Sequence, residues 1–369
     1  PGDIVFTQRG TLGQVAIVPD GKHERYVISQ SQMKLTPNDE LVDALFLYYQ
    51  FIGPEQQAYI EAHKIQTGVP HTNLGILRNT PLLIPPLPEQ RAIAHILGAL
   101  DDKIELNRRM NRTLEAMARA LFQSWFVDFD PVRAKLRGEA PPGLAPEIAA
   151  LFPDRLVEVE GRSAPEGWKV TSILNFAERL SGGTPKTSVQ EYWNGDIRWV
   201  SAKDVKNSSG SFVIETERTI TRAGISSSAA NILPANTTVV TARGTVGSYC
   251  LLAEDMAINQ TNYGLKSKLS VGGDYFVFFS LANLVAWLQQ NTHGTIFDTI
   301  TTDTLQQTKT FLPKPEIIAA FESVVSPLMK LMREHLYQNR TLAELRDTLL
   351  PKLMSGEVRV PEAAEWIGG

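Results

Sequence analysis

Residues 88–126 read PEQRAIAHILGALDDKIELNRRMNRTLEAMARALFQSWF, and their apolar residues recur at alternating steps of four and three. This heptad spacing is typical of a helix that packs lengthwise on another helix. At 1.5 Å per residue the helix would be roughly 58 Å long, which is too long for an ordinary core helix. We therefore predict a rod that needs a partner, the alternative being a solvated helix on a globular domain. The predicted seam is Ile93, Leu97, Leu100, Ile104, Asn107, Asn111, Leu114, Ala118, Leu121 and Trp125.

Residues 314–354 supply a matching rod, KPEIIAAFESVVSPLMKLMREHLYQNRTLAELRDTLLPKLM. Pro327 is expected to bend this helix or to mark where its main run begins, and Pro351 is expected to end it. We predict that residues 321–350 pack antiparallel on residues 88–126 within one chain. The two asparagines in the first seam cost stability but can fix the register and the partner. The second seam is Phe321, Val324, Leu328, Leu331, His335, Gln338, Leu342, Leu345, Leu349 and Leu353.

An internal repeat extends beyond the two rods. Residues 88–89 match 315–316 and residues 111–114 match 339–342, while residues 4–13 (IVFTQRGTLG) match 238–247 (TVVTARGTVG). Residues 29–31 (SQS) match 259–261 (NQT). The chain is therefore predicted to be two copies of one unit, each a globular part followed by a helix. Because Pro1 aligns with Ala235 but the second globular part opens at about Glu166, the first copy is expected to be truncated at its N-terminus.

Composition sets few limits on function. A length of 369 residues allows two or three domains. The net charge of −4 gives no electrostatic argument for nucleic acid, so any DNA contact must depend on local patches. The single cysteine, Cys250, excludes internal disulfides, fits a reducing cytoplasm and is interpreted as a small core residue. No apolar run is long enough to span a bilayer.

The pattern along the chain predicts α+β globular units. We expect strands at 3–6, 14–18, 26–28 and 82–84, helices at 41–52 and 55–64, and a Pro-rich linker at 138–146. In the second copy we expect a helix at 171–180, strands at 197–201, 212–214, 237–241, 248–252 and 265–268, and a buried helix at 274–289. The predicted bounds are 1–87, 88–127, 128–165 (linker), 166–313, 314–355 and 356–369 (tail).

Enzyme signatures are mostly absent. The Gly-rich segment 182–186 lacks the Gly-Lys-Ser/Thr ending of a P-loop, and the six histidines show no spacing typical of a zinc site. The acidic residues near Pro153 lack the lysine of a metal-dependent nuclease, and no Asn-Pro-Pro-Tyr-like loop is present for methyl transfer. We therefore predict no catalytic residue, no metal ligand and no cofactor in this chain.

Polar loops suited to DNA contact remain. Arg9-Gly10-Thr11 and Arg243-Gly244-Thr245 each follow a predicted strand, where glycine lets the backbone approach a phosphate and Arg or Thr donates to phosphates or base edges. The other reading is a plain β-turn with an arginine beside it. Trp193 and Trp199 are interpreted as core packing rather than base stacking. The candidate DNA-binding residues are Arg9, Thr11, Thr184, Lys186, Lys203, Lys206, Arg243 and Thr245; for Thr184 and the lysines, a solvated loop position is the alternative.

Three stretches carry a resemblance to a known family. Residues 87–135 resemble the central conserved region of the specificity subunits of type I restriction–modification enzymes, and residues 345–357 (LRDTLLPKLMSGE) resemble their C-terminal conserved region. Residues 165–168, 181–185 (SGGTP) and 192–197 (YWNGDI) are similar to the opening of their target-recognition domains. The likeness covers essentially the whole chain, except that the first recognition domain lacks its opening part.

The resemblance implies two target-recognition domains held apart by an antiparallel helix pair. Each domain would read one half of a bipartite double-stranded DNA site, in the cytoplasm. The implied partners are two methyltransferase subunits using S-adenosylmethionine and restriction–translocase subunits using ATP and magnesium, so this chain would be non-catalytic. The alternative is a coiled-coil scaffold that binds only proteins, for instance an inactive or decoy specificity subunit.

Overall fold

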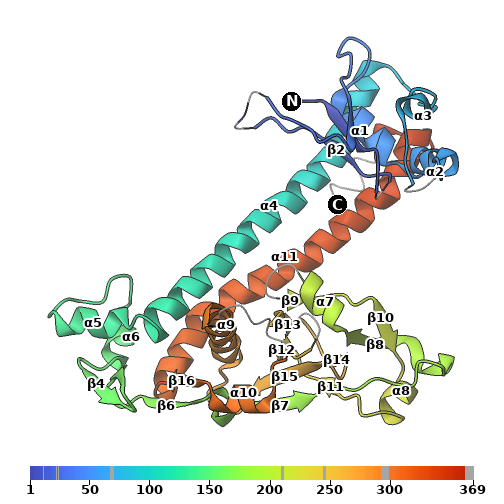
Figure 1. The fold of residues 1–369 in the computed structure, drawn as a ribbon. Coiled ribbons are helices and arrows are strands. Elements are labelled where there is room, and N and C mark those ends of the chain that lie inside the picture. The colour runs from blue at the N-terminus through green and yellow to red at the C-terminus, as the bar shows by residue number, and fades with distance from the viewer. Residues whose placement is uncertain are drawn as a thin grey trace. The chain divides into compact units, whose positions relative to one another are not determined.

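The computed structural model describes residues 1–10, 12–21, 23, 25–66, 70–208, 212–243, 247–291 and 299–361 (Figure 1). The chain packs as two compact units. Unit 1 comprises Pro1–Asn107 with Gln338–Gly369, and unit 2 comprises Arg108–Tyr337. Both long helices, α4 (Leu87–Phe126) and α11 (Pro315–Ser355), contribute a part to each unit. The domain bounds predicted above treat these helices as separate segments, and those bounds stay a prediction.

Unit 1 contains a small antiparallel sheet beside short helices and parts of α4 and α11. The strand order is β2-β1-β3. Its core joins Phe46 and Tyr49 to the α4 residues Ile93 and Leu97 and to Leu349 of α11. The elements are β1 (Ile4–Thr7), β2 (Val15–Ile17), β3 (Gln32–Leu35), α1 (Ala44–Ile52), α2 (Pro54–His63) and α3 (Leu74–Arg78).

Unit 2 contains a five-stranded sheet of order β7-β15-β12-β13-β9 and a four-stranded sheet of order β10-β8-β14-β11. Between helix α4 and the first strand of the five-stranded sheet, the chain forms α5 (Asp130–Leu136), α6 (Pro146–Leu151), β4 (Leu156–Val159), β5 (Arg162–Pro165) and β6 (Lys169–Ser172). The remaining elements are β7 (Ala177–Ser181), β8 (Trp193–Val200), α7 (Ala202–Asn207), β9 (Phe212–Val213), β10 (Arg218–Ile220), α8 (Arg222–Ser226), β11 (Ile232–Leu233), β12 (Thr238–Thr241), β13 (Tyr249–Leu252), β14 (Met256–Ile258), β15 (Asn262–Ser267), α9 (Asp274–Asn291), α10 (Thr302–Gln307) and β16 (Lys309–Leu312).

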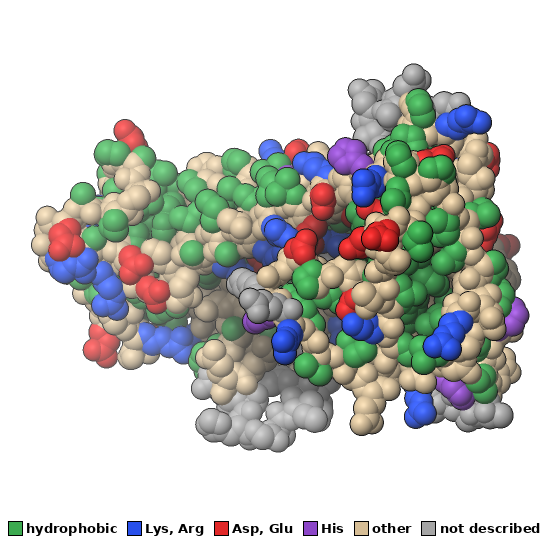
Figure 2. All heavy atoms as spheres, turned by 90° about the horizontal axis from the view of Figure 1, so that it is seen from above, with side chains coloured by type: hydrophobic (Ala, Val, Ile, Leu, Met, Phe, Trp, Pro, Cys, Tyr) green, Lys and Arg blue, Asp and Glu red, His purple; other side chains and the backbone are tan. Residues whose placement is uncertain are grey.

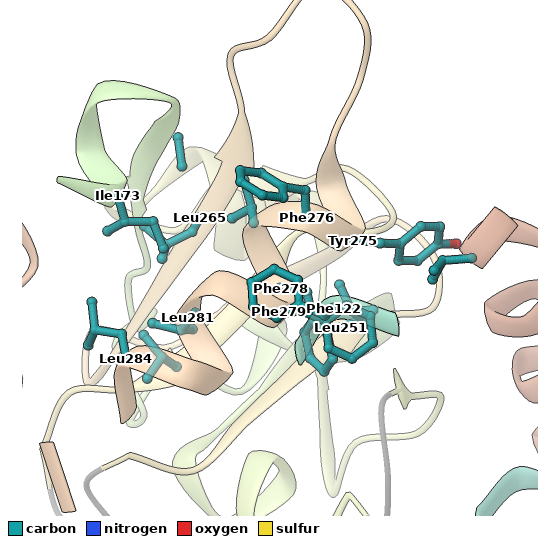
Figure 3. Close-up of a cluster of buried hydrophobic side chains, with 14 of the residues drawn as sticks. Phe122, Ile173, Leu251, Leu265, Tyr275, Phe276, Phe278, Phe279, Leu281 and Leu284 are labelled. Atoms are coloured by element: carbon teal, nitrogen blue, oxygen red, sulfur yellow. The ribbon is translucent and has the colours of Figure 1, made fainter. Parts of the chain in front are cut away.

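The core of unit 2 is built around α9, as the sequence predicts. Phe276 and Phe278 of this helix are completely buried, and Figure 3 shows them with Phe122 of α4. Phe126 of α4 packs against Phe276 and against Phe321 of α11, with ring centroids 5.1 Å apart in both pairs. Burial of these large aromatic rings contributes to the stability of unit 2.

The two long helices are antiparallel in each unit, which confirms the predicted pairing. In unit 1, Arg346 of α11 forms an ion pair with Asp101 of α4, at 2.6 Å between Nη1 and Oδ1. In unit 2, where the α4 numbers are higher, Asn111 contacts His335, with 2.7 Å between Oδ1 and Nδ1. The α11 residue numbers therefore fall as the α4 numbers rise.

The α11 seam differs from the predicted one in unit 2. Val325, Met329 and Met332 are fully buried, each one position after a predicted seam residue. This part of α11 packs on more than one neighbour, because Glu322 bonds the backbone of α9 and Arg333 donates to the Ala253 carbonyl. The buried face is therefore turned relative to a simple two-helix seam.

Pro351 does not end α11, contrary to the sequence-based expectation, and the helix is continuous through Pro327. The helix begins at Pro315, runs through Pro327 and Pro351, and ends at Ser355. A proline frees the carbonyl four residues before it. Those carbonyls belong to Ser323 and Asp347, both exposed, so water can bond them at little cost.

Two other sequence-based assignments are wrong. Residues 171–180 form strand β6, a 3₁₀ turn and strand β7 instead of a helix, because β16 and β15 pair with them. No strand forms at residues 26–28, where Val27 is exposed and the third strand lies at 32–35 instead. The predicted linker, 128–165, contains α5, α6, β4 and β5, and its Phe152 is buried against Trp125.

The predicted strand at 82–84 is also absent, and side chains explain where its backbone groups go. Gln50, Gln56 and Gln90 are buried, and each donates from Nε2 to a carbonyl of residues 83, 81 and 85 respectively, at 3.0, 3.2 and 2.7 Å. Alternate carbonyls of this segment are therefore satisfied by amides rather than by a neighbouring strand. In unit 2 the corresponding strand, β16, pairs with β6.

Among the described residues, no helix combines the length and the apolar character needed to cross a membrane.

One buried carboxylate makes stability depend on pH. Glu322 of α11 accepts a hydrogen bond from the Phe276 backbone N–H at 2.8 Å, near the start of α9. Burial raises the pKa of Glu322 from 4.5 to about 7, although that hydrogen bond opposes the shift. The folded protein therefore holds this proton more tightly than the unfolded chain, and the stabilisation is lost as pH rises between these two values.

We predict that Glu322→Gln, which keeps an acceptor oxygen and stays neutral, removes this loss. Relative to the variant, the wild type should lose on the order of 2–3 kcal/mol of unfolding free energy between pH 5 and pH 8. Urea unfolding midpoints at both pH values measure the difference. Glu316→Gln, at an exposed position of the same helix, is the matched control. The prediction would be contradicted if the difference in unfolding free energy between variant and wild type were the same at pH 5 and at pH 8.

Candidate nucleic-acid interface

The same β-hairpin occurs in both units, with the same register. β1 pairs with β2 so that Ile4 faces Ile17, and β12 pairs with β13 so that Thr238 faces Leu251, at the position the repeat predicts. The hairpin ends close in the same way: Thr7 N–H donates to the Gln14 carbonyl, and Thr241 N–H to the Ser248 carbonyl. The internal repeat is therefore a structural repeat.

Glycine is required where these hairpins turn. Gly13 and Gly247 occupy corresponding positions and have φ of 79° and 83°, in the left-handed region that side chains with a Cβ rarely adopt. Gly10 has φ 94° beside Arg9. The last glycine of the Arg-Gly-Thr-x-Gly pattern is therefore explained by the geometry of the turn. It gives no information on the role of the arginine.

Two further segments form backbone hydrogen bonds with the end of each hairpin, and these bonds occur at equivalent positions in the two units. In unit 2 the Ala242 N–H donates to the Thr261 carbonyl at 2.9 Å, and the Ala242 carbonyl accepts from Ile300 N–H at 3.0 Å. In unit 1 the Gln8 N–H donates to the Ser31 carbonyl at 2.7 Å, and the Gln8 carbonyl accepts from Thr72 N–H at 3.0 Å. The bridges Arg243 to Thr299 and Arg9 to His71 complete the correspondence.

We call these junctions the hairpin rims. The rim of unit 2 presents Thr184, Arg243, Gln260 and Thr299, and the rim of unit 1 presents Arg9, Gln30 and His71. Thr184 joins the rim because its hydroxyl donates to Oε1 of Gln260. Arg243, Gln260, Arg9 and Gln30 are exposed. Of the predicted DNA-binding residues, the structure thus places Thr184 and Arg243 at the rim of unit 2 and Arg9 at the corresponding position of unit 1.

The two glutamines were not predicted as site residues, although the repeat contained the signal. Gln260 and Gln30 lie at the centres of the matching triplets Asn-Gln-Thr and Ser-Gln-Ser. An exposed polar residue retained between two divergent copies indicates a role other than core packing.

The two lysines predicted around residue 204 do not lie in a loop. Lys203 and Lys206 are exposed on α7, whose first turn is a capping box of Ser201 and Asp204. Lys203 Nζ lies 2.6 Å from Oε2 of Glu217, and this bond raises the pKa of Lys203. Its charge is therefore already paired, which favours the reading of a solvated surface charge.

The remaining candidates divide between surface and core. Lys186 is exposed, and its carbonyl accepts from the Trp193 indole N–H at 3.2 Å. Trp193 and Trp199 are each 6% exposed and pack edge to face, which confirms them as core residues. Thr11 and Thr245 lie outside the described residues.

Within the described part of the chain, no metal-binding cluster accompanies the rims. Over the described ranges, His, Cys, Asp and Glu do not gather in any group able to hold a metal ion. Cys250 is buried, and burial raises its pKa to about 12, so it is a core residue as predicted. On the face seen in Figure 2, basic and acidic side chains are interspersed. This face therefore shows no extended patch of a single charge.

Known proteins share this organisation. A family model described as type I restriction modification DNA specificity domain matches residues 1–116 and 165–335, one stretch for each copy of the repeat. The specificity subunit of the type I restriction enzyme HindI from Haemophilus influenzae is 28% identical to this chain over an alignment of 401 residues. The alignment covers 97% of this chain and 86% of that protein. The MjaIX specificity subunit from Methanocaldococcus jannaschii is 24% identical over 376 residues, covering 98% and 78% respectively.

A solved structure has the same fold. The S subunit of a type I restriction–modification system from M. genitalium superposes with a TM-score of 0.57 at 17% sequence identity, covering 96% of this chain and 83% of that one. At this identity the likeness concerns the fold alone.

The turn formed by residues 259–261, with Gln260 at its centre, allows a test of how rigidly the rim is held. Asn259 Oδ1 accepts from the Thr261 N–H at 3.1 Å and from the Thr261 hydroxyl at 2.8 Å. We predict that Asn259→Ala speeds hydrogen exchange at the Thr261 amide by about tenfold, the effect of losing roughly 1.4 kcal/mol of local protection. Asn231→Ala is the control, because that exposed side chain bonds the nearby Ala229 carbonyl. Unchanged exchange at Thr261 would show that Asn259 does not hold the turn.

Proposed function

Because the chain belongs to the type I restriction modification DNA specificity family, we propose that it is the DNA sequence-recognition subunit of such a complex. Each unit reads one half of a bipartite double-stranded DNA site. The observation that carries this proposal is the hairpin rim, which recurs in both units with the same backbone bonds and an exposed arginine at the same place. Two copies of one reading surface suit a target made of two halves.

The chemistry belongs to partner subunits in this proposal, and this chain is non-catalytic. Methyltransferase subunits would supply S-adenosylmethionine and flip the target base out of the duplex. Restriction–translocase subunits would use ATP and magnesium. Within unit 2, helix α4 presents Met110 and Met117 to solvent, at 37% and 48% exposure. Their step of seven places them on one stripe of α4, which supports docking of a methyltransferase subunit on this helix.

One observation favours a second function, a helical scaffold that binds only proteins. The net charge is −4 and Lys203 is paired with Glu217, so the chain carries little free positive potential. Selection of bound sequences from a random DNA pool, using the chain with its methyltransferase subunits, separates the two functions. Enrichment of a bipartite motif supports the recognition subunit. Binding of the methyltransferase without any enriched DNA supports the scaffold.

One prediction of the proposed function concerns Arg243. If this exposed arginine neutralises a phosphate, Arg243→Ala should weaken binding of all sequences alike and lower the slope of log affinity against log salt by about one. A base contact would instead cost roughly 1–3 kcal/mol for one base at one position. Lys203→Ala is the matched control, because Glu217 already pairs with that lysine. An equal loss in both variants, or none in either, would contradict a specific role of the rim.

Another prediction of the proposed function concerns the number of base pairs between the two half-sites. Seven residues inserted after Asn107 and seven after Tyr337 extend both helices where the two units divide and keep the heptad in phase. One heptad adds about 10.5 Å of helix, close to three base pairs of DNA. The preferred spacer should grow by about three base pairs. Binding should also weaken, because three base pairs rotate one half-site by roughly a hundred degrees.

Methylation of targets with graded spacer lengths measures this preference. Insertion of four residues at the same two positions is the control, because it breaks the heptad phase and should abolish assembly. An unchanged preferred spacer after the seven-residue insertion would show that the long helices do not set the distance.

A further inference from the structure

We propose that Gln260 and Gln30 are equivalent DNA-backbone contacts in the two units, and that base reading falls to rim positions where the units differ. The inference rests on the proposed function and names which rim side chains carry affinity and which carry specificity.

Both glutamines are presented in the same way. In unit 2 the side chains on either side of Gln260 bond each other, with 2.8 Å between Asn259 Oδ1 and Thr261 Oγ1. In unit 1 the side chains on either side of Gln30 also bond each other, with 2.8 Å between Ser29 Oγ and Ser31 Oγ. Each glutamine is therefore held at the centre of a turn that its own neighbours close, and both glutamines are exposed.

The main chain of each turn is anchored to the hairpin. The carbonyl of the residue after the glutamine, Thr261 or Ser31, accepts from the backbone N–H just before the rim arginine. The glutamine and the arginine of one rim thus lie on adjacent, hydrogen-bonded segments. A donor pair held this way needs little reorganisation to meet neighbouring phosphate oxygens.

In unit 2 the hydrogen bond to Thr184 orients the amide of Gln260. The Thr184 hydroxyl donates to Oε1, which has a second lone pair, and the Nε2 group keeps its two donors for a ligand. A phosphate oxygen requires only a donor, whereas adenine in the major groove requires a donor and an acceptor together. The oriented Nε2 group is therefore suited to a phosphate oxygen.

The comparison between units supports the same division. A side chain that both units share cannot by itself distinguish two different half-sites, whereas phosphates are the same in every sequence. The arginine and the glutamine are shared by the two rims. The bridging position is not shared, since it is His71 in unit 1 and Thr299 in unit 2. We therefore assign backbone contact to the shared side chains and base discrimination to this differing position.

The experiment uses the full chain assembled with its methyltransferase subunits, and DNA duplexes carrying the selected target and each single-base change in it. Gln260→Ala and Gln30→Ala should each weaken binding about tenfold, as expected for one hydrogen bond to a charged group. The loss should be the same on every duplex. The salt slope should not change, because glutamine carries no charge.

Gln260→Lys distinguishes a backbone contact from a structural role. A lysine keeps a donor and adds a positive charge, so binding at low salt should equal or exceed that of the wild type, and the salt slope should steepen by about one. Gln190→Ala, at an exposed glutamine outside the rim, is the control and should leave affinity unchanged. His71→Ala should relax the preference at one base position of one half-site only.

The outcomes separate the two levels of the proposal. A wild-type complex that selects no DNA sequence overturns the proposed function and the inference with it. A wild-type complex that binds its target while Gln260→Ala and Gln30→Ala bind equally well overturns the inference alone. A loss confined to one base position in these variants overturns the backbone assignment, because it shows that the glutamines read bases.

Discussion

Buried amides constrain how the two long helices pair, and the rest of the structure depends on that pairing. In unit 1, Asn107 is completely buried on α4 and donates to Asn339 and Gln338 of α11, at 3.0 and 3.2 Å. In unit 2, Asn111 donates to the Met332 carbonyl at 3.1 Å and contacts His335. Sliding one helix along the other would leave the buried amide of Asn107 without these partners, at a cost of about 1–3 kcal/mol. The polar residues therefore select one register among several that the apolar seam alone would accept.

The two units share a hairpin but support it differently. In unit 2, strands β7 and β9 extend the sheet on both sides, and β6 pairs with β16. The described part of unit 1 has three sheet strands, and its extended segment 81–85 is held by buried glutamine side chains instead of a strand. Backbone polar groups must be satisfied in either case, and the chain achieves this with two different sets of donors.

The rims show how a chain without excess positive charge can still address DNA. Steering by a broad positive field requires many unpaired basic residues, and here acidic residues accompany them, as Lys203 with Glu217 and Arg198 with Glu254 illustrate. What both units do have in common is a rigid turn that carries an exposed arginine and an exposed glutamine. Recognition in this arrangement depends on a few side chains held in place by backbone bonds, and less on net charge.

The sequence by itself determined the features that depend on local periodicity: the two long helices, their antiparallel pairing, the buried helix α9, the hairpin repeat and the family. A heptad, an apolar run and a glycine-limited turn are each legible in a few adjacent residues. The tertiary structure alone decided features that depend on distant partners. Residues 171–180 are strands because β15 and β16 lie beside them, and α11 passes Pro327 because its freed carbonyl belongs to an exposed residue. Lys203 is paired because Glu217 is brought to it, and Thr184 joins the rim because its hydroxyl bonds Gln260. None of these partners is adjacent in sequence, so no pattern in the chain could have identified them.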